Sequence, residues 1–245
     1  MTPASATIRL PNNEAQHLSR VLRLGAHADV QVLNGRGLLR GARVASVAGS
    51  EVVLDLGAEV HAVAESRTKV TLAQALLKGD KMDDVVRDAA MAGAVAIQPI
   101  VTAHTEPTLA RAAERRLERW HAVAVGSAKQ SGRAVVPAVE RPRPLGEVLS
   151  EARDVVVVLV EPSAGQAALI AVPMPPPERA TLFVGPEGGW AAEELRRFRD
   201  AGATLTTLPG PTWRADAIGL IGIVLLDVVW EGREGWTAWR PTRST

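Results

Sequence analysis

The chain has no cysteine and no long apolar segment, and both absences restrict what it can be. Without cysteine it can form no disulfide framework, no zinc–thiolate site and no cysteine nucleophile. No apolar run approaches the roughly 18 residues needed to span a bilayer. The first ten residues, MTPASATIRL, lack the basic and then apolar pattern of a secretory signal. We therefore expect a cytoplasmic protein with no metal site and no membrane partner.

An excess of one charge is also missing. Lys and Arg total 28 against 27 Asp and Glu, so net charge argues neither for nor against a nucleic-acid partner. Residues 111–143 are an exception, because they hold eight basic residues and three acidic ones. A phosphate-facing surface and an exposed, solvated helix both predict such a local excess, and the sequence leaves the two open.

The first 64 residues read as a small β domain. Short alternating segments such as DVQVLNG and SEVVLDL predict strands, and Asn34-Gly35 is a signal for a two-residue type I′ hairpin. One helix is expected after Asn13 as its cap, with Gln16 completing a capping box. Residues 1–64 therefore predict a small β-barrel with one helix.

Strand and helix candidates alternate over residues 67–232, which predicts one α/β domain with helices on both faces of a parallel sheet. The run VVVVLV at residues 155–160 is typical of a strand buried on both sides. A helix is expected from its cap at Asp80 to Gly93, a long helix over 108–131, and a short strand over 134–139. Residues 233–245 are expected to be a tail.

Three glycine- or proline-rich loops follow predicted strands, at residues 160–165, 185–189 and 208–217. Ligands of open parallel sheets bind beyond the carboxyl ends of the strands, so the loops are expected to form one pocket. The patterns of the P-loop and of the dinucleotide fold are absent. Glu187 also disfavours a phosphate and favours a cationic or zwitterionic ligand. Simple turns without a ligand remain an alternative.

Five segments together resemble, in order and spacing, the ribosomal RNA small-subunit methyltransferase E family of the SPOUT superfamily. The resemblance extends from about residue 8 to residue 230. The segments are HLSRVLRL (17–24), QALLKGDKMDDVVRDAAMAGA (74–94), RWHAVAVGSAKQSGRAVVPAV (119–139), FVGPEGGWAAEEL (183–195) and LPGPTWRADAIGL (208–220).

The resemblance implies a fold and an activity. It implies an N-terminal PUA-like β-barrel for RNA, an α/β SPOUT domain whose C-terminal end forms a deep trefoil knot, and a homodimer. It also implies an S-adenosyl-L-methionine cofactor and methyl transfer to N3 of a uridine (m3U) in 16S rRNA of the small ribosomal subunit.

The resemblance also implies roles for particular residues. The cofactor-binding positions are Val160, Glu161, Gly185, Pro186, Glu187, Gly188, Gly189, Leu208, Gly210, Trp213 and Arg214. The RNA-binding positions are His17, Arg20, Arg23, Lys78, Lys81 and Arg133. Arg214 and Arg133 are the expected catalytic cations, which would stabilise the uracil anion, and Glu187 and Asp216 would assist removal of the proton. The equal spacing of His17, Arg20 and Arg23 predicts one stripe on a helix, and Trp120 is expected in the core.

The chain departs from the family pattern at several positions. Met91-Ala92-Gly93 replaces a Glu-Leu-Gly, His104 stands at an arginine position, and the last loop reads TWRADAI instead of Leu-Arg-Thr-Glu-Thr-Ala. Beside the implied uridine-N3 methyltransferase, three alternatives stay open. The altered last loop favours an RNA-binding relative with impaired catalysis. The other two are a SPOUT enzyme for another target, such as a ribose 2′-hydroxyl, and a general nucleotide-binding α/β protein.

Overall fold

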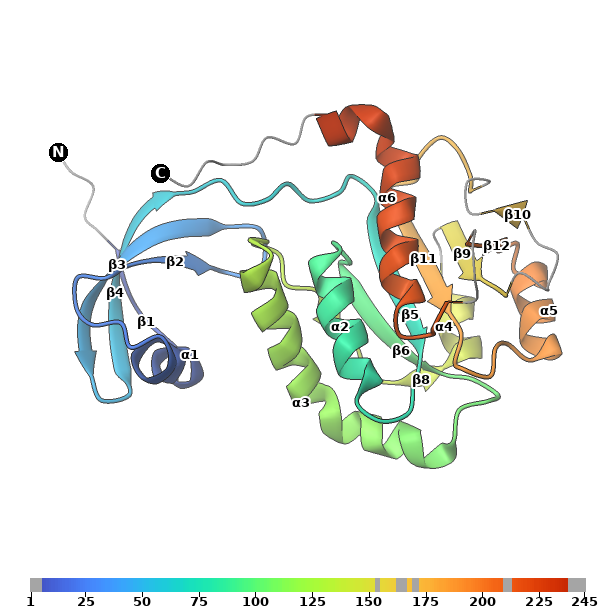
Figure 1. Ribbon diagram of the computed structural model, residues 1–245, viewed down its shortest axis with the longest axis horizontal. Helices are drawn as coiled ribbons and strands as arrows, with labels where there is room; N and C mark the ends of the chain where they lie inside the picture. Colours follow the sequence, from blue (N-terminus) through green and yellow to red (C-terminus); the bar gives the residue numbers. More distant parts are fainter. Residues whose placement is uncertain (1–5, 153–154, 162–166, 169–171, 209–212, 238–245) are drawn as a thin grey trace. The chain divides into compact units, whose positions relative to one another are not determined.

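The computed structural model describes residues 6–152, 155–161, 167–168, 172–208 and 213–237 (Figure 1). The chain forms two compact units. One holds residues 1–64 together with 132–135, and the other holds residues 65–131 and 136–245. The boundary after residue 64 agrees with the division expected from the sequence, whereas the inclusion of residues 132–135 in the smaller unit is not expected from it.

The smaller unit is a four-stranded antiparallel sheet in the order β1-β4-β3-β2. Its strands are β1 (Thr7–Arg9), β2 (Asp29–Leu33), β3 (Leu39–Ala48) and β4 (Glu51–Glu59). Val44, Val52 and Leu54 alternate with exposed or half-buried positions and are fully buried, and they pack with Ala15 and Leu18 of the helical segment. The period-2 burial explains why the sequence pattern predicts these strands correctly.

The hairpin between β2 and β3 exists, but the predicted turn type is wrong. The strands end at Leu33 and resume at Leu39, so the connection has five residues instead of two. The side-chain oxygen of Asn34 accepts hydrogen bonds from the backbone N–H groups of Arg36 (2.8 Å) and Leu38 (3.1 Å). Asn34 thus organises a longer loop through its side chain, which a dipeptide signal does not reveal.

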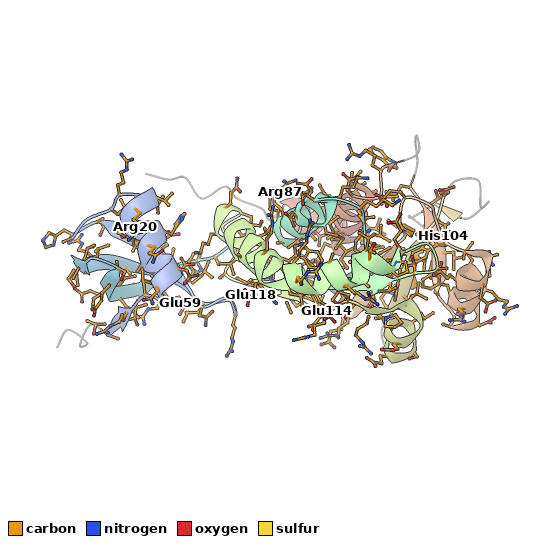
Figure 2. All side chains as sticks on the ribbon, turned by 90° about the horizontal axis from the view of Figure 1, so that it is seen from below. Arg20, Glu59, Arg87, His104, Glu114 and Glu118 are labelled. Carbon is orange, nitrogen blue, oxygen red and sulfur yellow. The ribbon has the colours of Figure 1, made fainter. Side chains whose placement is uncertain are left out.

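The helical segment of the smaller unit also differs from expectation. The helix α1 (Asn12–Gln16) begins after Pro11 and has no side-chain cap, so the capping box of Asn13 and Gln16 is wrong. It continues as the π-helix η1 (His17–Val21), and Arg23 lies beyond the helix end with φ of 52°. Three-residue spacing therefore does not place His17, Arg20 and Arg23 on one stripe, because π-helical winding differs and Arg23 is not helical. All three are exposed, and Figure 2 labels Arg20.

The larger unit contains a parallel sheet in the order β10-β12-β9-β11-β5-β6-β7, with β8 also paired to β6. The strands are β5 (Lys69–Ala75), β6 (Ala96–Val101), β7 (Ala138–Val139), β8 (Arg143–Pro144), β9 (Val155–Leu159), β10 (Ala167–Ala168), β11 (Arg179–Val184) and β12 (Thr204–Thr207). The parallel α/β architecture expected from the alternating pattern is confirmed.

Helices pack on both faces of this sheet (Figure 1). They are α2 (Lys81–Met91), α3 (Pro107–Gln130), α4 (Leu145–Glu151), α5 (Ala192–Asp200) and α6 (Ile218–Thr237). In β9, Val157 and Leu159 join the core shared with α2, α3 and α6, whereas Val158 and Val160 join the core shared with α4 and α5. A strand with both faces buried has to be apolar at every position, which explains the run VVVVLV.

Three further local predictions are answered by individual contacts. Asp80 precedes α2 but makes no capping bond, because its carboxylate pairs with Arg116 at 3.1 Å. The predicted strand over 134–139 is limited to β7, since the backbone oxygen of Ala134 accepts a hydrogen bond from Gly37 of the smaller unit's sheet region. Trp120 is 1% exposed and donates to Asp83, so its placement in the core is confirmed.

The approach of α6 to the sheet is limited by backbone contact at Gly222. A Cβ added there would lie 2.9 Å from Leu182 Cδ2 and 3.0 Å from Leu159 Cδ1. A helix packed this closely leaves no space for a side chain, so glycine is required for the observed spacing.

Within the described ranges, no helix is long and apolar enough to cross a membrane. The same residues contain no group of three His, Cys, Asp or Glu side chains arranged to hold a metal ion.

Candidate active site

A pocket of about 510 Å³ lies where three adjacent parallel strands end. The strands are β12, β9 and β11, whose last residues are Thr207, Leu159 and Val184. Because neighbouring parallel strands end at one edge of the sheet, the segments that follow them meet there, as the sequence predicts. The volume is typical of a site for a small molecule.

The turn at residues 185–189, which we call the glycine turn, forms one wall of the pocket. It is closed by a hydrogen bond from the Gly189 N–H to the Pro186 oxygen (3.0 Å), and Gly189 has a φ of 68°. A Cβ on Gly185 would lie 3.2–3.4 Å from the indole ring of Trp190. The ring is held by its N–H, which donates to the Leu159 oxygen (2.8 Å). Glycine is needed at both positions, and its backbone is left accessible to a ligand.

Glu187 in this turn is not the free negative charge that the sequence analysis supposes. Its Oε1 lies 2.7 Å from Nζ of Lys81 at the start of α2. Burial raises the pKa of Glu187, but the hydrogen bond and charge of Lys81 outweigh this and leave the pKa below its ordinary value. The carboxylate is therefore ionised at neutral pH and balanced by a cation that also lines the pocket.

A second ion pair lies on the opposite segment, residues 213–216. Arg214 donates from Nε to Asp216 Oδ1 (3.0 Å) and from Nη2 to Oδ2 (2.5 Å). Burial raises the pKa of Asp216, but the hydrogen bonds from Arg214 lower it by more, so the pKa lies below its ordinary value. The Arg214 side chain is 74% exposed, and two of its five N–H groups are used here. The remaining N–H donors are available to a substrate.

Glu161 supplies a carboxylate without a cation. It follows β9, it is exposed, and it makes no ion pair or hydrogen bond with any residue that the structure describes. Its Oε1 would lie 3.4 Å from a Cβ on Gly189, so the carboxylate lies beside the glycine turn. The described lining of the pocket therefore contains two balanced ion pairs and one additional negative charge.

The structure brings together the residues that the resemblance implies for cofactor binding. Every one that lies within the described ranges lines the pocket, and Gly210 lies outside them. The sequence analysis omits several further lining residues, which are Leu159, Val184, Trp190, Leu195, Thr207, Ala215 and Ile218. Apart from Thr207 they are apolar, as core residues are, so no sequence signal separates the two groups.

Of three other predicted site residues, two lie outside the pocket lining and one belongs to it. Arg133 belongs to the smaller unit, is 4% exposed and does not line the pocket, so its predicted contact with a base or phosphate receives no support from its position. Lys78 pairs with Glu106 at 2.6 Å, outside the pocket lining. Lys81 does line the pocket.

Three of the eight basic residues in the stretch 111–143 pair with acidic side chains. Arg116 pairs with Asp80, Arg119 with Asp83, and Arg143 with Glu151. Glu114 and Glu118, labelled on α3 in Figure 2, alternate in sequence with Arg111, Arg115 and Arg119. These contacts favour an exposed, charge-balanced helix over a phosphate-binding surface for this stretch.

Comparison with known proteins identifies the family. Residues 64–223 match the family model described as an RNA methyltransferase domain, and residues 10–56 match the model described as an RNA methyltransferase PUA domain. The chain belongs to this RNA methyltransferase family. The resemblance seen in the sequence is therefore confirmed.

Curated relatives of this chain carry the name ribosomal RNA small subunit methyltransferase E. The protein from Synechocystis is 32% identical over 78% of this chain and 62% of its own length. The Bacillus subtilis protein is 27% identical over 79% of each chain. The match thus spans about three fifths of the length of the Synechocystis relative.

Solved structures agree with the two-part fold. A ribosomal RNA small subunit methyltransferase E from Neisseria gonorrhoeae, bound to S-adenosyl methionine, aligns with a TM-score of 0.84 and 26% identity over 94% of each chain. A methyltransferase from Legionella pneumophila with bound cofactor SAM aligns with a TM-score of 0.83 over 91% of this chain and 92% of its own, at 24% identity. The second likeness establishes the fold alone. The α/β fold with a PUA-like N-terminal domain is confirmed.

Proposed function

We propose that this protein is an S-adenosyl-L-methionine-dependent methyltransferase that acts on N3 of a uridine in 16S rRNA of the small ribosomal subunit. The observation that carries the proposal is the composition of the pocket. Open glycine backbone, a Glu161 with no cation partner among the described residues and an exposed Arg214 meet at the carboxyl edge of the sheet in a member of an RNA methyltransferase family.

The pocket suits the methyl donor in size and charge. Its volume of about 510 Å³ is ample for an adenosyl group. Backbone groups of the glycine turn and of Leu208 would hold the adenine and ribose, and Glu161 would balance the positive charge. When bound, S-adenosyl-L-methionine supplies the methyl group and its reactivity, so the protein mainly positions the base and manages charge.

Arg214 is the residue that would act on the uracil. Loss of the N3 proton leaves negative charge on the two carbonyl oxygens that flank N3, and a guanidinium with unused N–H donors stabilises that charge. Asp216 holds the guanidinium by two bonds and so fixes its orientation. Because Glu187 and Asp216 are both ionised and already paired, neither is a strong proton acceptor, and solvent would take the N3 proton.

The proposal includes several finer points. The deep trefoil knot is supported by the chain path, since β12 lies beyond β9 from β11 whereas the following α6 packs back on β11 and β5. A homodimer is supported by Val224 and Val228, which leave apolar surface exposed on α6. Light scattering tests the homodimer, and a monomer mass would exclude it. A cytoplasmic location follows from a ribosomal substrate.

The activity is tested by incubating the purified protein with S-adenosyl-L-methionine and small ribosomal subunits or 16S rRNA from a strain that lacks this gene. Nucleosides are then analysed by mass spectrometry. We expect 3-methyluridine to appear with the wild type and not with Arg214→Ala. A 2′-O-methylated nucleoside in its place would reveal a different target.

RNA binding without any methylated nucleoside would support the alternative of an impaired RNA-binding relative. Titration calorimetry with S-adenosylhomocysteine and with ATP separates a methyltransferase from a general nucleotide-binding protein. We expect binding of the first compound only.

A further inference from the structure

The turn that follows β6 makes contacts with the glycine turn that the proposed chemistry does not use. Residues 102–105 form a tight turn, in which the Thr105 N–H donates to the Thr102 oxygen and the Thr102 N–H donates to Oγ1 of Thr105, both at 3.0 Å. The two hydroxyl groups also lie 3.0 Å apart. These bonds fix the shape of the turn and therefore the position of its exposed tip, Ala103 and His104.

His104 bonds directly to the backbone of the glycine turn. Its Nδ1 lies 3.0 Å from the Gly189 oxygen. A carbonyl oxygen only accepts hydrogen bonds, so Nδ1 has to carry a proton and donate. Nδ1 does so in the imidazolium and in one neutral tautomer, and the bond therefore survives either charge state of the ring. Figure 2 labels His104 on the larger unit.

A separate carboxylate joins the turn at 102–105 to the start of α5. The carboxylate of Glu194 accepts from the Ala103 N–H (2.8 Å) with one oxygen and from the Ala191 N–H (2.9 Å) with the other. Glu194 is 7% exposed, so these bonds are protected from water. The turn at 102–105 is thereby held against the start of α5, at a constant distance from the glycine turn.

We propose that His104 is a positioning residue for the cofactor, an inference that rests on the proposed function. Its Nδ1–H fixes the orientation of the peptide group between Gly189 and Trp190. Gly188 and Gly189 have unusual backbone freedom, and the bond removes part of it before a ligand arrives. Affinity rises because the backbone donors and acceptors of the glycine turn are already in place. His104 itself does not line the pocket.

Two amide substitutions distinguish this role from general packing. In His104→Asn the side-chain nitrogen is attached to Cγ, as Nδ1 is, so the variant keeps a donor at the same place. In His104→Gln the nitrogen lies one bond further out, near the position of Nε2. We expect the Kd for S-adenosyl-L-methionine of the Asn variant to stay within about twofold of wild type. The Gln and Ala variants should bind about three- to tenfold more weakly, as for loss of one hydrogen bond.

The control is His121→Ala, which removes an exposed histidine on α3 and should leave the Kd unchanged. The effect should fall on Kd and on KM for the cofactor, with kcat at saturating cofactor retained. Long-range ¹H–¹⁵N spectra of the wild type should show the Nδ1-protonated tautomer for His104, and thermal unfolding checks that each variant is folded.

The outcomes separate the two proposals. Equal Kd values for wild type, Gln and Ala variants, or an Nε2-protonated tautomer, would overturn the role of His104 alone. If the folded wild type binds no S-adenosyl-L-methionine, the proposed function fails and this inference fails with it. Weak binding by Gln and Ala together with rescue by Asn would support the inference.

Discussion

The two polar walls of the pocket are built differently. The glycine turn is bonded from outside by Lys81 and His104, and the adjoining Trp190 is bonded to β9. In the segment at 213–216, the bonds of Arg214 run to Asp216 in the same segment, and its side chain is 74% exposed. The first wall offers fixed backbone, whereas the second offers a charged side chain to whatever enters. This difference favours a division of roles, in which one wall binds the cofactor and the other acts on the base.

The largest effect is expected at the exposed wall. Arg214→Ala should lower kcat by about 100-fold or more, because removal of one donor to a developing oxyanion has effects of that size. The Kd for S-adenosyl-L-methionine should change little, since backbone of the other wall holds the cofactor. Single-turnover methylation and calorimetry measure the two quantities. A variant with near-normal kcat would show that the walls do not divide their roles in this way.

A methyl group added to the glycine turn should instead affect cofactor binding more than kcat. In Gly185→Ala the new Cβ would lie 3.2–3.4 Å from the Trp190 ring, so the ring has to move and its bond to Leu159 is strained. We expect the cofactor Kd to rise roughly fivefold, which is about 1 kcal/mol, with a smaller effect on kcat. Gly126→Ala is the matched control, because nothing lies within 4 Å of its added Cβ. Unchanged binding by Gly185→Ala would contradict the close fit of the wall.

A smaller effect is expected from the unpaired carboxylate between the walls. S-adenosylhomocysteine lacks the sulfonium charge of S-adenosyl-L-methionine. The Kd for S-adenosylhomocysteine divided by the Kd for S-adenosyl-L-methionine therefore reports how strongly the site favours that charge. Glu161→Gln should reduce this ratio by about threefold, a modest change because water screens an exposed carboxylate. Equal loss of affinity for both compounds would instead place Glu161 near the ammonium group that they share.

The smallest effect concerns the pH dependence of the Arg214–Asp216 pair. The pKa of Asp216 is lowered in the folded protein, so the pair stabilises the fold fully above the ordinary pKa of 3.8. That stability is lost as the pH falls through the lowered value. Asp216→Asn should therefore be less stable than wild type near pH 6, and the difference should shrink as the pH drops below about 4. Urea unfolding at several pH values measures it, and a constant difference would exclude this linkage.

Much of the larger unit is predictable from sequence because its patterns reflect burial. The run at residues 155–160 has to be apolar on both faces, and the glycines at 185 and 189 are required by the Trp190 ring and by a positive φ. Three strands that end side by side then force their loops together. The common pocket therefore follows from elementary rules on parallel sheets.

Side-chain partnerships are the part that the sequence does not reveal. Lys81 and Glu187 are more than 100 positions apart, and His104 meets Gly189 across 85. Nothing local marks such pairs. In the smaller unit, the Asn34 loop and the π-helix at His17–Val21 are likewise set by hydrogen bonds that short motifs do not encode. The sequence therefore does not reveal how the charges at the pocket are balanced.

Gly222 gives the inner core influence over the pocket rim. The residues that its missing side chain would strike include Leu159, the last residue of β9, and the helix that carries it begins with Ile218, which lines the pocket. A single added methyl would have to displace the Leu159 and Leu182 side chains or the helix itself. The packing at position 222 is thus coupled to the ligand chamber through Leu159 and through the helix that begins at Ile218, although Gly222 does not line the chamber.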